Sequence, residues 1–148
     1  MATGNGQSGL AYIHDGYMAT AYIAGVDRLY PSVRIEYRPF GHREKALWQR
    51  GAANLDAIEF EDLVDRELAN RIKIWDIKDS SGKAVAVHVN TLARIQPVLR
   101  DRLVGVVFGS QAPDVDPKAA ADESRALAED KFRGSPEGQT VLAGANGT

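Results

Sequence analysis

The fold is decided by residues 72–109, IKIWDIKDSSGKAVAVHVNTLARIQPVLRDRLVGVVFG. This stretch predicts the end of a helix, a tight turn over residues 79–82, a short strand, and two helices divided by Pro97. Each polar residue in it has a structural explanation, and none is arranged for chemistry. Such a pattern is typical of a small protein that holds a partner rather than one that turns over a substrate.

The turn predicts a small hairpin in which residues 75–77 lie against residues 85–87. Trp75 faces the core of this hairpin, and Gly82 completes the turn by composition. We expect Asp76 to accept hydrogen bonds from backbone amides of the turn. These residues are therefore interpreted as structural.

The two helices after the hairpin carry their own boundary signals. Asn90 is the predicted N-cap of a helix over residues 91–96. Pro97 cannot donate a backbone hydrogen bond, so it is expected to begin the second helix. That helix is predicted to end at Gly109 and to bury its apolar side chains, Val98, Leu99, Leu103, Val106 and Val107.

Outward from this stretch, residues 16–23 and 33–37 alternate in the manner of strands and predict an N-terminal β-hairpin. Residues 41–50 predict a helix. Residues 56–75 predict a longer one, with Asp56 as N-cap and Glu59 completing a capping box. The sequence therefore predicts an α+β class: a small, mainly helical domain with an N-terminal β-hairpin and a short second hairpin.

The two ends of the chain differ from the middle. Residues 1–10 are predicted to be a flexible arm, residues 11–109 a single α+β domain, and residues 110–148 a flexible acidic tail. This tail holds seven acidic and four basic residues and little to bury. One helix is expected within it, over residues 118–132, where Leu127 and Phe132 are candidates for binding a partner.

Composition excludes several classes of function. With no cysteine among 148 residues, thiol catalysis, cysteine-bound zinc and disulfides are all excluded. A formal net charge of -2 does not indicate nucleic acid. No leader pattern or apolar run of about 20 residues is present. We therefore expect a soluble cytoplasmic protein without a nucleic-acid or membrane partner.

No catalytic, metal or cofactor site is predicted. The spacing of Gly4, Gly6 and Gly9 matches a dinucleotide-binding pattern but lacks a preceding strand. The three histidines, His14, His42 and His88, are scattered rather than grouped as metal ligands. The sequence thus predicts a protein that is not an enzyme and needs no cofactor.

Two charged stretches leave alternatives open. Residues 56–67 are acidic and suit a solvated helix face better than a pair of catalytic carboxylates. Residues 28–50 are basic, with aromatic side chains that include Trp48. They could bind nucleic acid, but charge complementarity with the acidic helix, within the chain or between subunits of a homo-oligomer, is favoured. Trp48 is a further candidate for binding a partner.

Taken together, IEYRP, HREKALW and residues 72–103 resemble tail assembly chaperone-like proteins of tailed phages and prophages. The resemblance covers residues 17–109. In these proteins a Trp-Asp pair leads into a glycine turn, a short strand, a capped helix and a proline-containing helix. Trp75, Asp76, Gly82, Asn90 and Pro97 stand at those positions here.

The resemblance implies a non-enzymatic phage morphogenesis protein, a tail assembly chaperone that binds the helical tape measure protein in the host cytoplasm. Such a role needs an apolar groove for an amphipathic helix. The alternative is a virion structural component (a neck, connector, tail or decoration protein) that is retained in the particle. The expected partners are therefore phage tail or other virion proteins, together with further copies of this chain.

Overall fold

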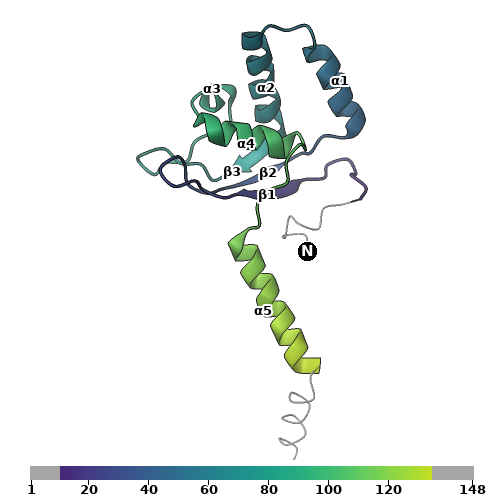
Figure 1. Ribbon diagram of the computed structural model, residues 1–148, viewed down its shortest axis with the longest axis vertical. Coiled ribbons are helices and arrows are strands. Elements are labelled where there is room, and N and C mark those ends of the chain that lie inside the picture. Colours follow the sequence, from purple (N-terminus) through teal and green to yellow (C-terminus); the bar gives the residue numbers. More distant parts are fainter. Residues whose placement is uncertain (1–10, 135–148) are drawn as a thin grey trace, which may run out of the picture. The chain divides into compact units, whose positions relative to one another are not determined.

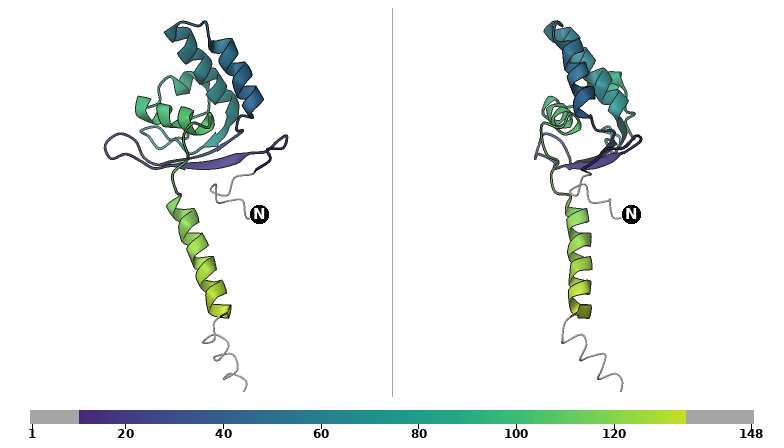
Figure 2. Two further views of the ribbon diagram at one scale, coloured as in Figure 1. Left: turned by 45° about the vertical axis from the view of Figure 1, so that its right-hand side comes forward. Right: turned by 90° about the vertical axis from the view of Figure 1, so that its right-hand side faces the viewer.

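The computed structural model of the chain describes residues 11–134, with side chains up to residue 130. Within these residues a three-stranded antiparallel sheet, in the order β1-β2-β3, is combined with five helices. Helices α1 to α4 lie on one side of the sheet (Figure 1, Figure 2). The predicted class, a small α+β domain with an N-terminal β-hairpin, is therefore confirmed.

The N-terminal hairpin consists of β1, Ala19–Ile23, and β2, Val33–Tyr37, paired antiparallel. Alternate side chains of β2 are buried, because one face of the sheet packs on the helices and the other does not. The first strand is shorter than the predicted 16–23. Gly16 has a φ of +80°, and β1 begins only after this turn.

Two antiparallel helices follow: α1, His42–Ala52, and α2, Ala57–Arg71. The predicted capping box of the second helix is present. The amide of Glu59 donates to the Asp56 carboxylate at 2.8 Å, and the Asp56 amide donates to the Glu59 carboxylate at 3.2 Å. Two of the free amides at the start of α2 are therefore satisfied by side chains.

The helix predicted to continue to Trp75 ends at Arg71, and Ile72–Trp75 forms strand β3 instead. This strand pairs antiparallel with β2, with Ile35 opposite Trp75. Ile72 and Trp75 are nevertheless buried in the core. Ile72 and Trp75 are three residues apart, which is the spacing of a helix face, so the apolar pattern indicated a helix. Both are buried in the strand because its pairing with β2 shifts register between Glu36 and Tyr37.

Arg71 is a buried cation at the end of α2, and its side chain is 2% exposed. It forms ion pairs with Glu44 at 2.6 Å and Glu67 at 2.8 Å. It also donates to the backbone carbonyls of residues 38 and 39, and it lies 3.4 Å from the ring centroid of Phe40. The charge is compensated on several sides, so Arg71 joins α1 and α2 to the end of β2.

The predicted second hairpin is present as a bridged turn rather than as two regular strands. Lys78 pairs with Ala84, and the amide of Val85 donates to the carbonyl of Ile77 at 2.9 Å. The chain then enters two helices, α3, Val89–Leu92, and α4, Pro97–Val107. The first is shorter than the predicted 91–96 and begins earlier.

Helix α4 begins at Pro97, as predicted, and buries Leu99 and Leu103. The prediction that Val98 is buried is wrong, since its side chain is 45% exposed. Once Pro97 sets the start of the helix, Val98 falls on a different face from Leu99. Gly109 follows the end of the helix with a φ of +85°, the left-handed conformation expected of a glycine there.

Residues 110–116 were predicted to belong to the flexible tail, but they return to the sheet. The amide of Asp114 donates to the carbonyl of Tyr22 at 2.9 Å, and its carboxylate accepts from the Ala24 amide at 2.8 Å. Asp116 accepts two hydrogen bonds of 2.9 Å from Arg34. The first compact unit therefore ends at Asp116, not at Gly109.

The second unit begins at Pro117 with helix α5, Pro117–Gly134. This helix spans the residues over which one was expected, 118–132. Its side chains from residue 121 to residue 130 are exposed, and Leu127 is 62% exposed. No helix in the described part of the chain is long and apolar enough to cross a membrane. The predicted arm, residues 1–10, lies outside the described residues, as do residues 135–148.

Candidate partner-binding groove

The turn before α3 is organised by Asp79. Its Oδ1 accepts hydrogen bonds from the Ser81 hydroxyl at 2.6 Å, the Ser81 amide at 2.8 Å and the Lys83 amide at 3.1 Å. The hydroxyl of Ser81, followed by the two amides, lowers the pKa of Asp79 below its ordinary value. Gly82 has a φ of +84°, which explains why glycine completes the turn.

Asp76 does not bind the turn, and this expectation is corrected. Its carboxylate accepts from the backbone amide of Arg34 at 2.9 Å, and its own amide donates to the Arg34 carbonyl at 3.3 Å. Asp76 therefore prolongs the pairing of β2 beyond the end of β3. The sequence indicated a structural carboxylate here, but only the sheet register shows which amide it meets.

Trp75 ties this turn to the core. Its side chain is 8% exposed, and its indole Nε1 donates to the carbonyl of Val85 at 2.6 Å. The buried positions expected for Trp75, Leu92, Leu99 and Leu103 are confirmed. The indole thus holds residues 85–87, which lack a regular strand partner, against β3.

The N-cap of α3 is His88, not Asn90. The amide of Asn90 donates to His88 Nδ1 at 3.1 Å, and the His88 amide donates to the Thr91 hydroxyl at 3.1 Å. Thr91 also donates to the carbonyl of Ala86 at 2.6 Å. Asparagine is the commoner cap, but the chain enters the helix earlier than its composition indicates.

A groove of about 730 Å³ lies between these elements. It is lined by the connection between β1 and β2 (residues 29–33), the turn (76–79 and 85) and the junction of α3 and α4 (91, 94–96 and 99). All of these segments belong to the first unit of the chain. The groove therefore joins three segments that are far apart in the sequence.

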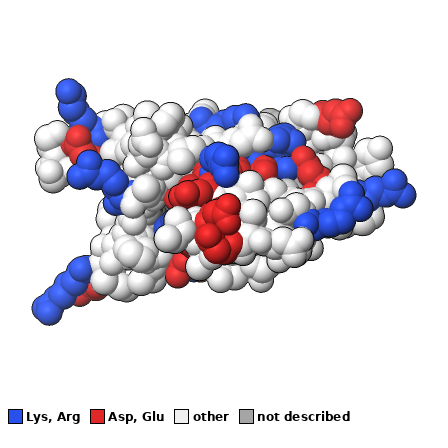
Figure 3. Space-filling view, turned by 90° about the horizontal axis from the view of Figure 1, so that it is seen from above, with Lys and Arg blue, Asp and Glu red and all other residues white. Residues whose placement is uncertain are grey.

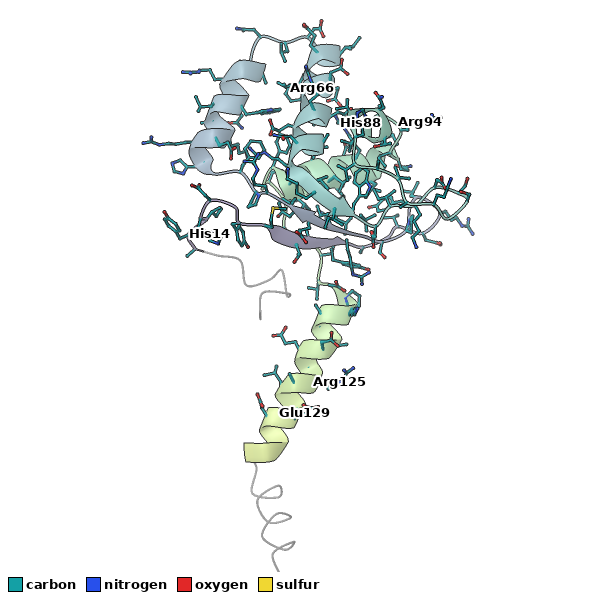
Figure 4. All side chains as sticks on the ribbon, turned by 180° about the vertical axis from the view of Figure 1, so that it is seen from behind. His14, Arg66, His88, Arg94, Arg125 and Glu129 are labelled. Carbon is teal, nitrogen blue, oxygen red and sulfur yellow. The ribbon has the colours of Figure 1, made fainter. Side chains whose placement is uncertain are left out.

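The groove has an apolar floor and a polar rim. Tyr30 and Leu99 are buried in the floor, and Leu29 is 45% exposed at the edge. Lys78 and Arg94 are exposed on the rim, and neither forms an ion pair with another described residue. Figure 4 shows Arg94 near His88, on the side of the molecule where α3 lies. An apolar segment of a partner can fill such a surface, with charged side chains at its edges.

Of the partner-binding candidates from the sequence, Trp48 belongs to the same unit as the groove and does not line it. Trp48 is half-buried among the rings of Phe40, Phe60 and Phe108, with centroids 6.4, 5.9 and 4.9 Å away. Its Nε1 is buried without a partner among the described residues. Trp48 is therefore a packing residue in the structure.

Leu127 lies exposed on α5, in the second unit, and the side chain of Phe132 lies outside those that the structure describes. The predicted N-terminal hairpin leaves residues 24–32 as its connection, and nothing in the hairpin prediction indicates that residues 29–33 line a groove. The signal was the placement of two large apolar residues, Leu29 and Tyr30, beside Pro31 in a loop. Within the described residues, no group of three or more potential ligands could hold a metal ion.

No protein-family model, no curated protein and no solved structure matches this chain.

Proposed function

We propose that this protein is a non-enzymatic binding protein whose groove holds an apolar segment of a protein partner. The observation that carries the proposal is the groove itself, with its apolar floor and charged rim. Leu29 stands 45% exposed at its edge, where a partner side chain would remove it from water. Burial of apolar surface is the main source of affinity for such a segment.

We further propose that the segment is an amphipathic helix of a tape measure protein, and that the chain is a phage tail assembly chaperone in the host cytoplasm. The resemblance over residues 17–109 supports this partner. The groove is lined by part of the same stretch, including residues 76–79 and 94–96. A chaperone of this kind shields the apolar face of its client until the tail is assembled.

Site-specific photo-crosslinking tests both the site and the partner. A photoreactive amino acid is placed at Leu29, which lines the groove, and in a control at Val98, which does not. Both side chains are 45% exposed, so they are equally accessible to solvent. Each variant is expressed in cells that contain the phage or prophage tail genes, and the adducts are identified by mass spectrometry.

The expected result is an adduct between position 29 and the tape measure protein, with none from position 98. An adduct with the tape measure protein from position 98 and none from position 29 would place binding elsewhere on the chain. Adducts with metabolic enzymes in place of morphogenetic proteins would overturn the phage assignment.

A virion structural component is the second proposal, and α5 favours it. Its side chains over residues 121–130 are exposed, and an isolated helix of this length gains little stability from its own hydrogen bonds. A permanent neighbour in a particle would supply the missing contacts. Purified particles decide between the two: a component is found in them in stoichiometric amount, whereas a chaperone is absent.

A further inference from the structure

The connection between β1 and β2 contains a tight turn that is closed by backbone hydrogen bonds. The amide of Val26 donates to the Tyr30 carbonyl at 3.0 Å, and the Val26 carbonyl accepts from the amides of Leu29 at 2.9 Å and Tyr30 at 3.1 Å. At the base of the turn, a Cβ on Gly25 would lie 2.7 Å from a backbone nitrogen on the other side of the connection. The two sides are therefore tightly packed, and residues 26–29, called the loop tip, have a defined conformation.

Arg28 has a strained backbone within this tip. Its φ is +66°, and it is the one non-glycine residue of the described chain in the left-handed region. It is the third residue of the turn that the Leu29 amide closes, where a positive φ favours glycine or asparagine. The side chain of Arg28 forms no ion pair with another described residue, not even with the neighbouring exposed Asp27. The stability of the fold therefore does not explain an arginine here.

The loop tip also exposes apolar surface. Val26 is 40% exposed and Leu29 is 45% exposed, and Arg28 between them is exposed as well. A hollow of about 520 Å³ is lined by residues 25–31 and shares three residues with the groove, including Leu29. Val26 and Arg28 line this hollow but not the groove. The loop tip thus continues the apolar edge of the groove beyond the groove itself.

The loop tip lies at an end of the first unit where cations project into solvent. Viewed from above, Lys and Arg side chains stand out at the left, the side on which Figure 1 places the β1–β2 connection (Figure 3). Exposed cations without an ion pair among the described residues include Arg28, Lys78 and Lys83. Asp76 and Asp79 accept backbone amides of this chain. A partner that binds here can therefore supply the counter-charge for Arg28.

We propose that the loop tip is a second contact for the client helix of the proposed function, on which this inference rests. The apolar face of the helix continues from the groove over Leu29 and Val26, and a carboxylate beside that face binds the guanidinium of Arg28. A carboxylate fits because it pairs with a guanidinium through two parallel hydrogen bonds. Arg28 then determines which segment binds, since an apolar helix without this carboxylate leaves the cation unpaired.

Crosslinking from Val26 tests the position of the helix. A photoreactive amino acid is placed at Val26 of the full chain, next to the variants at Leu29 and Val98. We expect adducts with the tape measure protein from positions 26 and 29 and none from position 98. An adduct from position 29 without one from position 26 would overturn the contact at the loop tip and leave the proposed function standing. Without an adduct from position 29, both proposals fail.

Substitutions of Arg28 distinguish a binding role from a structural one, because stability and binding should change in opposite directions. Arg28→Gly relieves the strained φ and should raise the thermal midpoint by about 3–5 °C. The same variant loses the guanidinium, so a tagged chain should retain about tenfold less tape measure protein. Arg28→Glu keeps a side chain at the strained position, so its midpoint should stay near that of the wild type while retention falls at least as far.

Two further variants serve as controls. Arg28→Lys keeps the charge and should retain more client than Arg28→Glu. Arg66→Glu reverses an exposed arginine that lines neither the groove nor the hollow, and it should retain client like the wild type. An Arg28→Gly chain that binds as well as the wild type would overturn the proposal, and so would an equal loss of client in Arg66→Glu. A glycine variant less stable than the wild type would show that Arg28 is structural.

Discussion

The Nη2 atom of Arg71 lies 2.6 Å from Oε2 of Glu44, and this contact joins the end of α2 to the first turn of α1. Arg71 is buried, whereas the Glu44 side chain is 44% exposed, so the pair bridges the core and the surface. Glu67 approaches the same guanidinium from within α2. The position of the α1–α2 pair on the sheet therefore depends on one buried cation.

Replacing Arg71 by Ala should lower the free energy of unfolding by about 3 kcal/mol, because it leaves Glu67 and two backbone carbonyls without their donor. Urea unfolding followed by circular dichroism measures the loss. The control is Arg66→Ala on the same helix, where the side chain is exposed and the change should stay within about 0.5 kcal/mol. Equal losses in the two variants would contradict a stabilising role for the Arg71 network.

Trp75 should show two separable contributions. Trp75→Phe removes the hydrogen bond to the Val85 carbonyl and should cost about 1 kcal/mol. Trp75→Ala also removes the buried ring and should cost about 3–5 kcal/mol. Thermal and urea unfolding of the two variants measure which of them loses more stability, and by how much. A Phe variant as stable as the wild type would show that the indole donor contributes nothing.

Substitutions of His88 and Asn90 should differ in their effect on stability, because only His88 caps α3. His88→Ala should lower the free energy of unfolding by about 1 kcal/mol, because the Asn90 amide loses its acceptor. Asn90→Ala should change it by less than about 0.5 kcal/mol, because the Asn90 side chain does not cap the helix. If Asn90→Ala is the more damaging variant in urea unfolding, the assignment of the cap is wrong.

Asp114 should make folding sensitive to acid. The Ala24 amide lowers its pKa below the ordinary 3.8; burial opposes the shift, and Arg102 adds to it. Because the pKa is lower in the folded state, the stabilisation is complete above the ordinary value and is lost as the pH falls through the lowered one. Urea unfolding from pH 6 to pH 2 measures the slope at about 25 °C.

Asp114→Asn is the matched variant for this titration. Its stability should fall less steeply with acid than that of the wild type, since the carboxylate no longer titrates. Parallel curves for the two proteins would show that Asp114 contributes nothing to the acid response.

The same substitution should have opposite effects at two glycines. Gly82→Ala should destabilise by about 1–2 kcal/mol, because its φ of +84° is strained for a residue with a Cβ. Gly51→Ala should stabilise by about 0.5–1 kcal/mol, because Gly51 is helical and an added Cβ there meets nothing within 4 Å. Thermal unfolding shows whether each substitution raises or lowers the stability. A stabilising Gly82→Ala would refute the positive φ of Gly82 in the turn.

The sequence predicted correctly those elements whose boundaries are set by neighbouring residues. The alternation of residues 33–37 predicts β2, the Asp56–Glu59 pair predicts the start of α2, and Pro97 predicts the start of α4. Each of these depends on the backbone of a few neighbouring residues. The prediction that Asn90 caps α3 is wrong, because the ring nitrogen of His88 accepts the hydrogen bond that an asparagine side chain usually accepts at an N-cap.

The acidic residues show the limit of such reasoning. By composition, Asp114 and Asp116 belonged to a solvated tail, yet they bind Ala24 and Arg34 across the sheet. Asp76 was expected to bind the amides of the turn, but Asp79 accepts them and Asp76 accepts the amide of Arg34 instead. The sequence identifies a carboxylate, but its donor is set by a strand many residues away.

The sequence by itself determined the α+β class, the N-terminal hairpin, the burial of Trp75 and the boundaries of α4, because propensity, alternation and caps act over a few residues. Only the tertiary structure decided that residues 72–75 form the third strand and that residues 29–33 close a groove. Both depend on contacts between distant segments, and such contacts are chosen by the packing of the whole core rather than by local preference.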